Sequence, residues 1–181
     1  MARLILLNGA PGTGKSTLAR RYADDNPLAL VLDIDTVRRM LGASLVDPEA
    51  SGLAARRLAL AMAREHLAAG HDVIVPQFLG RIEFVLELES LAASVAVPFL
   101  ELTLIADPDA VIRRFAERSA EPTSDEQRDA WTLQERWGGL DALRGACARV
   151  ETVAAARPAM CTIEVVDGAV DDAYAALRAV L

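Results

Sequence analysis

The chain has 181 residues, of which 52% are hydrophobic and only 4% aromatic, and its net charge is −7. That length fits one domain, which we expect to span residues 1–181, with a core built largely from aliphatic side chains. The acidic balance argues against nucleic acid as a partner without excluding it, and the lack of a long apolar run argues against a membrane span. The N-terminus shows no signal-peptide pattern, so we expect a cytoplasmic protein, either a monomer or a homodimer.

Short apolar runs alternate with helical stretches, which is typical of a parallel sheet covered by helices on both faces. Asp47 and Asp107, each followed by a proline and an acid, indicate the N-caps of two helices. We therefore predict a three-layer α/β fold. Strands are expected at residues 3–7, 28–32, 72–75, 99–105 and 161–166. Helices are expected from the glycine-rich turn to about residue 24, from 48 to about 70, from 108 to 118, and from about 169 onward.

The segment from residue 119 to residue 139 breaks the apolar pattern. It is polar, contains Trp131 and Trp137, and has the spacing of a capping box between Ser124 and Gln127. Because it follows the fourth strand and its helix, it is a candidate for a mobile helical lid over a bound ligand, at approximately 119–139. A solvated helical hairpin is an equally good interpretation of these residues.

Residues 9–16 read Gly-Ala-Pro-Gly-Thr-Gly-Lys-Ser and match the phosphate-loop pattern G-x-x-x-x-G-K-[ST] in full. The motif follows an apolar strand and precedes a helical stretch, where backbone N–H groups and the helix N-terminus can bind phosphate oxygens. Lys15 is the one lysine among 19 basic residues, and its compact ammonium suits the β- and γ-phosphates. Ser16 is the expected ligand of Mg²⁺. The predicted binding residues for ATP (or GTP) are Gly9, Ala10, Pro11, Gly12, Thr13, Gly14, Lys15, Ser16 and Thr17.

Two acids, Asp33 and Asp35, follow the second strand, and Arg38 lies three residues after Asp35. Ligands of open α/β sheets bind at the carboxyl ends of the strands, so Asp35 is placed to accept the proton of an incoming hydroxyl. Arg38 can hold the acceptor or neutralise charge in the transition state. A purely structural role remains open, in which Asp35 caps a helix over residues 36–41.

The phosphate loop and the Asp-x-x-Arg after the second strand resemble a group of P-loop kinases. This group includes phage-type polynucleotide 5′-hydroxyl kinase, chloramphenicol phosphotransferase and the zeta-toxin kinases. The likeness is best over residues 3–40 and weakens to general topology beyond them. It implies a P-loop NTPase fold with strand order 2-3-1-4-5, and it implies that Lys15 and Ser16 bind ATP·Mg²⁺. It also implies that Asp35 is the catalytic base and that Arg38 contacts the acceptor.

Arg114 and Arg118 lie on one face of the helix predicted over residues 108–118. In the resembling kinases, arginines at this place clamp phosphates or stack on adenine as the lid closes. The resemblance therefore implies that Arg114 binds the nucleotide and that Arg118 assists transfer. A salt-bridged surface helix is the alternative, since Glu117 is near by.

The sequence departs from the kinase pattern after the third strand, where an acid near Mg²⁺ is expected. Gln77 stands there instead, so the metal must rely on Ser16 and on Asp33 or Asp35. A neutral amide can bond a metal-bound water but supplies no charge. An ordinary loop residue is the other interpretation of Gln77.

The leading functional hypothesis is an ATP-dependent phosphotransferase that moves the γ-phosphate to a hydroxyl of a small-molecule acceptor. A polynucleotide 5′-hydroxyl kinase is the second hypothesis, and it is opposed by the acidic charge. A nucleotide-binding regulatory protein or slow NTPase is the third, and the missing acid supports it. The sequence does not name the acceptor, because acceptor pockets in this fold come from variable insertions. Phe78, Phe84, Trp131 and Trp137 are candidates for an apolar pocket wall or for core packing.

Overall fold

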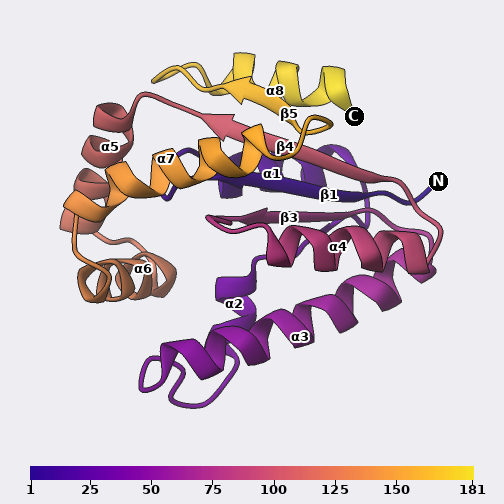
Figure 1. The fold of residues 1–181 in the computed structure, drawn as a ribbon, viewed down its shortest axis with the longest axis horizontal. Coiled ribbons are helices and arrows are strands. Elements are labelled where there is room, and N and C mark those ends of the chain that lie inside the picture. Colours follow the sequence, from indigo (N-terminus) through magenta and orange to yellow (C-terminus); the bar gives the residue numbers. More distant parts are fainter.

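A computed structural model describes residues 1–181, and its centre is a five-stranded sheet in the order β2-β3-β1-β4-β5. Every neighbouring pair of strands is parallel, so the predicted sheet and its strand order are confirmed. Parallel strands place all their carboxyl ends at one edge, and that edge faces α2, α5 and α6 in Figure 1. The strands are β1 (Leu4–Gly9), β2 (Leu30–Val31), β3 (Val73–Gln77), β4 (Phe99–Ile105) and β5 (Cys161–Glu164).

The second strand is much shorter than the apolar run that predicted it. Leu28 is 68% exposed and has a φ of 67°, and the N–H of Ala29 donates to the carbonyl of Asn26 at 3.0 Å. The chain therefore turns at Pro27–Leu28, and only Leu30–Val31 pair with β3. Residue type alone does not distinguish such a turn from a strand. Leucine is usually buried, but Leu28 has the backbone conformation of a turn.

Eight helices surround the sheet: α1 (Lys15–Asp25), α2 (Ile34–Arg39), α3 (Pro48–Ala68), α4 (Glu83–Ser94), α5 (Pro108–Ala120), α6 (Asp125–Arg136), α7 (Asp141–Ala155) and α8 (Val170–Val180). The side chains of Asp47, Asp107 and Ser124 each accept a hydrogen bond from a first-turn N–H, so these three predicted starts are confirmed. The sequence pattern did not predict the bounds of α4 and α7. No helix combines the length and the apolar character needed to cross a bilayer.

The two faces of the sheet bury separate cores. One face packs against α3, α4 and the end of α7, and its strand residues are Leu4, Leu6, Val73 and Val75. The other face packs against α1 and α8 through alternate residues of the same strands, such as Ile5 and Ile74. Strands buried on both faces read as continuous apolar runs, which is why β1 and β3 were recognisable in the sequence, whereas β4 also contains Glu101 and Thr103. The predicted three-layer architecture is therefore confirmed (Figure 1).

The amino ends of β1 and β3 are joined by an ionic network far from the carboxyl edge. The N–H of Arg3 donates to Asp72 Oδ1 at 2.8 Å, and its guanidinium Nη2 reaches Asp72 Oδ2 at 2.7 Å. Tyr22 of α1 donates its hydroxyl hydrogen bond to the same carboxylate. Burial acts to raise the pKa of Asp72, but the hydrogen bonds from Arg3 and Tyr22 together outweigh burial and hold that pKa below its ordinary value.

Asp72→Asn is expected to reduce the free energy of unfolding by about 1–2 kcal/mol at pH 7, because it weakens charge-assisted hydrogen bonds at a partly screened site. A depressed folded-state pKa stabilises the fold above the unfolded pKa of about 4, and that stabilisation disappears as the pH falls through the folded value. Urea unfolding should therefore show the gap between wild type and variant closing below pH 4. Asp171→Asn, in a salt bridge where the acid is 86% exposed, is the control and should cost less. A gap independent of pH would contradict the ionic origin.

Candidate functional site

The loop between β1 and α1 is built around close backbone approaches. A Cβ on Gly9 would lie 2.6 Å from the hydroxyl of Thr13, which itself donates to the carbonyl of Ala10 at 2.8 Å. Gly12 has a φ of +92°, and a Cβ there would lie 3.1 Å from the carbonyl of Val111 in α5. Side chains at these two positions would open the curl, so local space and conformation require glycine at Gly9 of the motif and at Gly12, a variable position of the motif.

Helix α1 begins directly at the end of this loop. Its N-cap is Gly14, no side chain caps its first turn, and no acid lies in that turn. The first-turn N–H groups and the positive end of the helix dipole are therefore available to an anion. Ser16 lies in this turn and its hydroxyl makes no hydrogen bond within the protein, while Thr17 is exposed.

Lys15 folds back over the phosphate loop. Its Nζ donates to the carbonyl of Ala10 at 2.9 Å. Burial, and to a lesser extent the positive charge of Arg118, lower the pKa of Lys15 to about 8, although Asp33 and Asp35 act in the opposite direction. The charge of Lys15 is thus influenced by both acids after β2 and by Arg118 of α5, at the carboxyl edge of the sheet.

Asp33 caps α2, whereas the sequence had suggested Asp35 for that role. Asp33 Oδ1 accepts from the N–H groups of Asp35 and Thr36 at 2.9 Å and 3.3 Å. The capping alternative for Asp35 was wrong because α2 begins at Ile34, two residues earlier than expected. Burial raises the pKa of the Asp33 carboxyl, as does the charge of Asp35, and the two backbone hydrogen bonds and Lys15 oppose this rise.

Asp35 is left free of any capping function and its side chain is 58% exposed. Its Oδ1 lies 3.2 Å from Nη2 of Arg38, the predicted partner one turn later. The Arg38 side chain is only 6% exposed, and its Nε is buried without a hydrogen-bond partner. Arg38 thus lies beneath Asp35, where it holds the carboxylate.

The two arginines predicted on α5 diverge. Arg118 stacks over the ring of Phe115, with its guanidinium carbon 5.1 Å from the ring centroid, and its charge acts on Lys15. Nη1 of Arg114 lies 3.7 Å from Oδ1 of Asp167, in the turn after β5. The Nε and Nη2 atoms of Arg114 are buried without hydrogen-bond partners. Each arginine therefore faces a different part of the edge.

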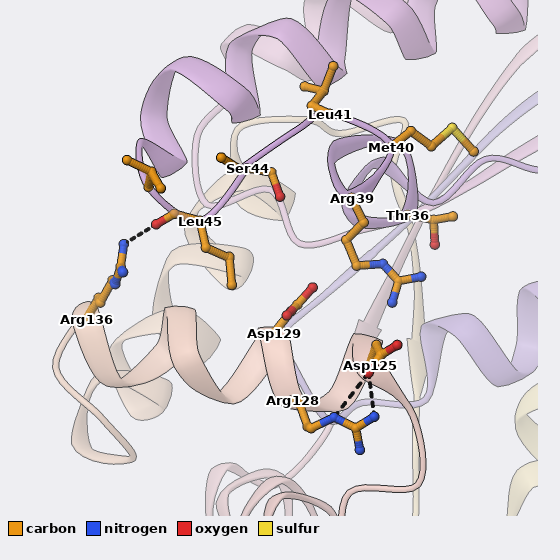
Figure 2. A pocket seen from close by; sticks show the side chains of 12 residues that line it. Thr36, Arg39, Met40, Leu41, Ser44, Leu45, Asp125, Arg128, Asp129 and Arg136 are labelled. Carbon is orange, nitrogen blue, oxygen red and sulfur yellow. Dashed lines mark hydrogen bonds and ion pairs between the residues drawn. The ribbon is translucent and has the colours of Figure 1, made fainter.

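A cavity of about 880 Å³ lies between residues 36–46 and the helix α6, and Thr36, the residue after Asp35, is part of its lining. Figure 2 shows Arg39 from α2 and Asp129 from α6 directed toward the same space. Arg39 forms an ion pair with Glu126, and Nη1 of Arg136 donates to the carbonyl of Leu45 at 2.6 Å. Helix α6 is therefore bound both to α2 and to the loop that follows α2.

None of the four aromatic residues suggested as a pocket wall lines this cavity. Phe84 is buried in the core on α4, and Trp131 packs near Phe115 with 6.2 Å between ring centroids. Phe78 packs under the guanidinium of Arg149, and Trp137 is 61% exposed. Arg39 was not singled out from the sequence, since nothing local distinguishes it from the adjacent Arg38.

A parallel sheet of order 2-3-1-4-5 whose first strand leads into G-x-x-x-x-G-K-S defines a P-loop NTPase. The chain belongs to the AAA domain family AAA_33, whose model matches residues 4–137. It therefore stands among the P-loop small-molecule kinases, as the sequence resemblance indicated.

Solved structures share this fold over most of the chain. A protein from Chloroflexus aurantiacus assigned as a kinase is 20% identical, with a TM-score of 0.69, over 99% of this chain and 93% of that one. A gluconokinase from Sinorhizobium meliloti is 16% identical, with a TM-score of 0.59, over 97% and 91%. A chain of the Pnkp1/Rnl/Hen1 RNA repair complex is 16% identical, with a TM-score of 0.65, over 86% of this chain and 46% of that one. None of the curated proteins compared matches the sequence.

Proposed function

We propose that the protein transfers the γ-phosphate of ATP, or of GTP, to a hydroxyl of a small-molecule acceptor, with Asp35 as the general base. The observation that carries this proposal is the placement of Asp35. Its exposed carboxylate acts on the charge of Lys15, and the next residue, Thr36, lines the cavity. We propose that this carboxylate accepts the proton of a hydroxyl bound in the cavity as the hydroxyl attacks a phosphate held by the loop.

In the proposed reaction the acceptor oxygen forms a bond to the γ-phosphorus, and the bond from that phosphorus to the β–γ bridging oxygen breaks. ADP leaves with the bridging oxygen, and the hydroxyl proton passes to the Asp35 carboxylate and then to solvent. Lys15 and Arg118 stabilise the negative charge that spreads over the transferring group. Arg38 keeps the Asp35 carboxylate in place through its ion pair. Arg114, with two unpartnered nitrogens, is proposed as a contact to the nucleotide.

The residues at the loop suit Mg²⁺, which binds oxygen ligands and usually retains several waters. The Ser16 hydroxyl makes no hydrogen bond within the protein, and the cap of α2 uses only one carboxylate oxygen of Asp33. Ser16 would hold the ion directly and Asp33 would face it. Bound Mg²⁺ would neutralise charge on the β- and γ-phosphates.

The acceptor cavity is lined by charged, polar and aliphatic side chains and has no aromatic surface. Arg39, Arg128 and Arg136 supply donors, while Asp125 and Asp129 supply acceptors. A volume of about 880 Å³ suits a small molecule, since ligand sites commonly span ~300–1,000 Å³. We therefore propose a polar, non-aromatic acceptor with several hydroxyl or charged groups. A helical lid at 119–139, within one domain of residues 1–181, would close over it through α6.

The test is a screen for γ-phosphate transfer from ATP·Mg²⁺ to pooled hydroxyl compounds, with ADP release followed in parallel. The pools include polyols, sugars and sugar acids, nucleosides, and 5′-hydroxyl oligonucleotides. A polyol or sugar pool that gains phosphate and raises ADP release supports the proposal. Transfer to oligonucleotides alone would replace it with a polynucleotide kinase. ADP release that no pool raises would replace it with a slow NTPase.

A further inference from the structure

Gln77 ends β3 at the edge where the phosphate loop begins. Its Cα is paired in register with that of Asn8, the residue directly before Gly9. By strand alternation Gln77 shares the face of Val73 and Val75, and α2, which Asp33 caps, packs in the same core. Gln77 therefore lies on the strand next to the phosphate loop, and Asp33 lies beyond it on the outer side, after β2.

The side-chain oxygen of Gln77 is buried and has no hydrogen-bond partner in the protein. Buried polar atoms in native proteins are nearly always satisfied, so an orphaned amide oxygen at a ligand-binding edge indicates a missing donor. The neighbouring polar side chain shows the contrast. Asn8 is fully buried, and its Oδ1 accepts from the N–H groups of Gly9 and Leu79, both at 2.8 Å.

Asn8 also fixes the chain around Gln77. Its Nδ2 donates to the carbonyl of Leu79 at 3.1 Å, so one side chain binds both backbone groups of Leu79 and extends the pairing of β1 with β3. The start of the phosphate loop and the residues after Gln77 thus form one rigid unit. The backbone around Gln77 is therefore fixed by hydrogen bonds, so the lack of a partner for its side-chain oxygen does not result from an irregular loop.

We propose that Oε1 of Gln77 accepts a hydrogen bond from a water molecule bound to Mg²⁺, in the place where P-loop proteins commonly carry an acid. The inference rests on the proposed function, because it requires a nucleotide and its metal in the loop. Nowhere in the chain do three or more His, Cys, Asp or Glu side chains gather as a metal site. The ion would therefore depend on phosphates, on Ser16 and on such water-mediated contacts, and loss of one of these contacts should weaken metal binding.

The experiment measures Mn²⁺, as a spectroscopic probe, binding to protein saturated with the β,γ-imido analogue of ATP. Gln77→Met is expected to weaken Mn²⁺ affinity by about tenfold, while analogue affinity measured in EDTA stays at the wild-type value. Gln77→Glu adds a charge and is expected to bind Mn²⁺ more tightly than wild type. Thr162→Val changes an exposed residue of β5, outside the site, and should leave both affinities unchanged.

Metal-free analogue binding separates the two proposals. Wild-type Mn²⁺ affinity in both Gln77 variants, with analogue still bound, would overturn the role of Gln77 and leave the proposed kinase function standing. Failure of the wild-type protein to bind the analogue at all would overturn both. If Gln77→Met does not fold, the nearly isosteric Gln77→Glu decides, because unchanged Mn²⁺ affinity in that variant alone would contradict the inference.

Discussion

Lys15→Ala is expected to weaken ATP binding at least about 30-fold. The ammonium lies over the phosphate loop, with Nζ 2.9 Å from the carbonyl of Ala10, and Lys15 is the only lysine of the chain. Removing one partner of a buried charge pair costs about 2–5 kcal/mol, which corresponds to a factor of about 30 or more in Kd. Isothermal titration of ATP·Mg²⁺ into wild type and variant measures this directly.

Two further variants make the result specific. Arg20→Ala removes an exposed cation from the same helix and should leave ATP affinity unchanged. Lys15→Arg keeps the charge but replaces a compact ammonium with a planar guanidinium in a site where burial already disfavours a cation, so it should recover only part of the affinity. Unaltered ATP affinity in Lys15→Ala would contradict the assignment of the phosphate cradle.

The phosphate loop was the part of the site most fully predictable from sequence, because its function depends on backbone geometry. Gly9 is required by the space next to Thr13, and Gly12 by its positive φ and its approach to α5. The constraint on Gly9, and the positive φ of Gly14, fall on the two glycines of the fixed motif. The buried strands were recognisable for a similar reason, since burial on both faces requires continuous apolar residues. The strand order came from the resemblance, because apolar runs alone do not encode it.

The parts that sequence reasoning missed depend on tertiary contacts. The identity of the cap turned on where α2 begins, and a shift of two residues moved it from Asp35 to Asp33. The cavity lies where α2 and the loop after it approach α6, and Arg39 there pairs with Glu126, 87 residues away along the chain. Arg38 and Arg39 are indistinguishable by type, and only helix rotation decides that the first is buried and the second faces the cavity.

Asp35→Asn is expected to lower the rate of phosphate transfer by about 100- to 10,000-fold, the range that a positioned general base contributes. ATP affinity should stay within a few-fold of wild type, because the carboxylate does not hold the phosphate loop together. The amide keeps an oxygen for the guanidinium of Arg38 at nearly the same place, so the fold around α2 should persist. Steady-state kinetics with the acceptor found in the screen, together with ATP titration, separate these two effects.

The outcome depends on kcat rather than on KM. A base acts in the transition state, so its removal lowers kcat, whereas loss of an acceptor contact alone would raise KM and leave kcat unchanged. Asp24→Asn changes an exposed acid of α1 in the same way and should leave both constants at wild-type values. If Asp35→Asn still transfers phosphate at the wild-type rate, Asp35 is not the general base. Proton removal must then be assigned to another group at the cavity, with Asp129 as the first to test because it faces the same space from α6.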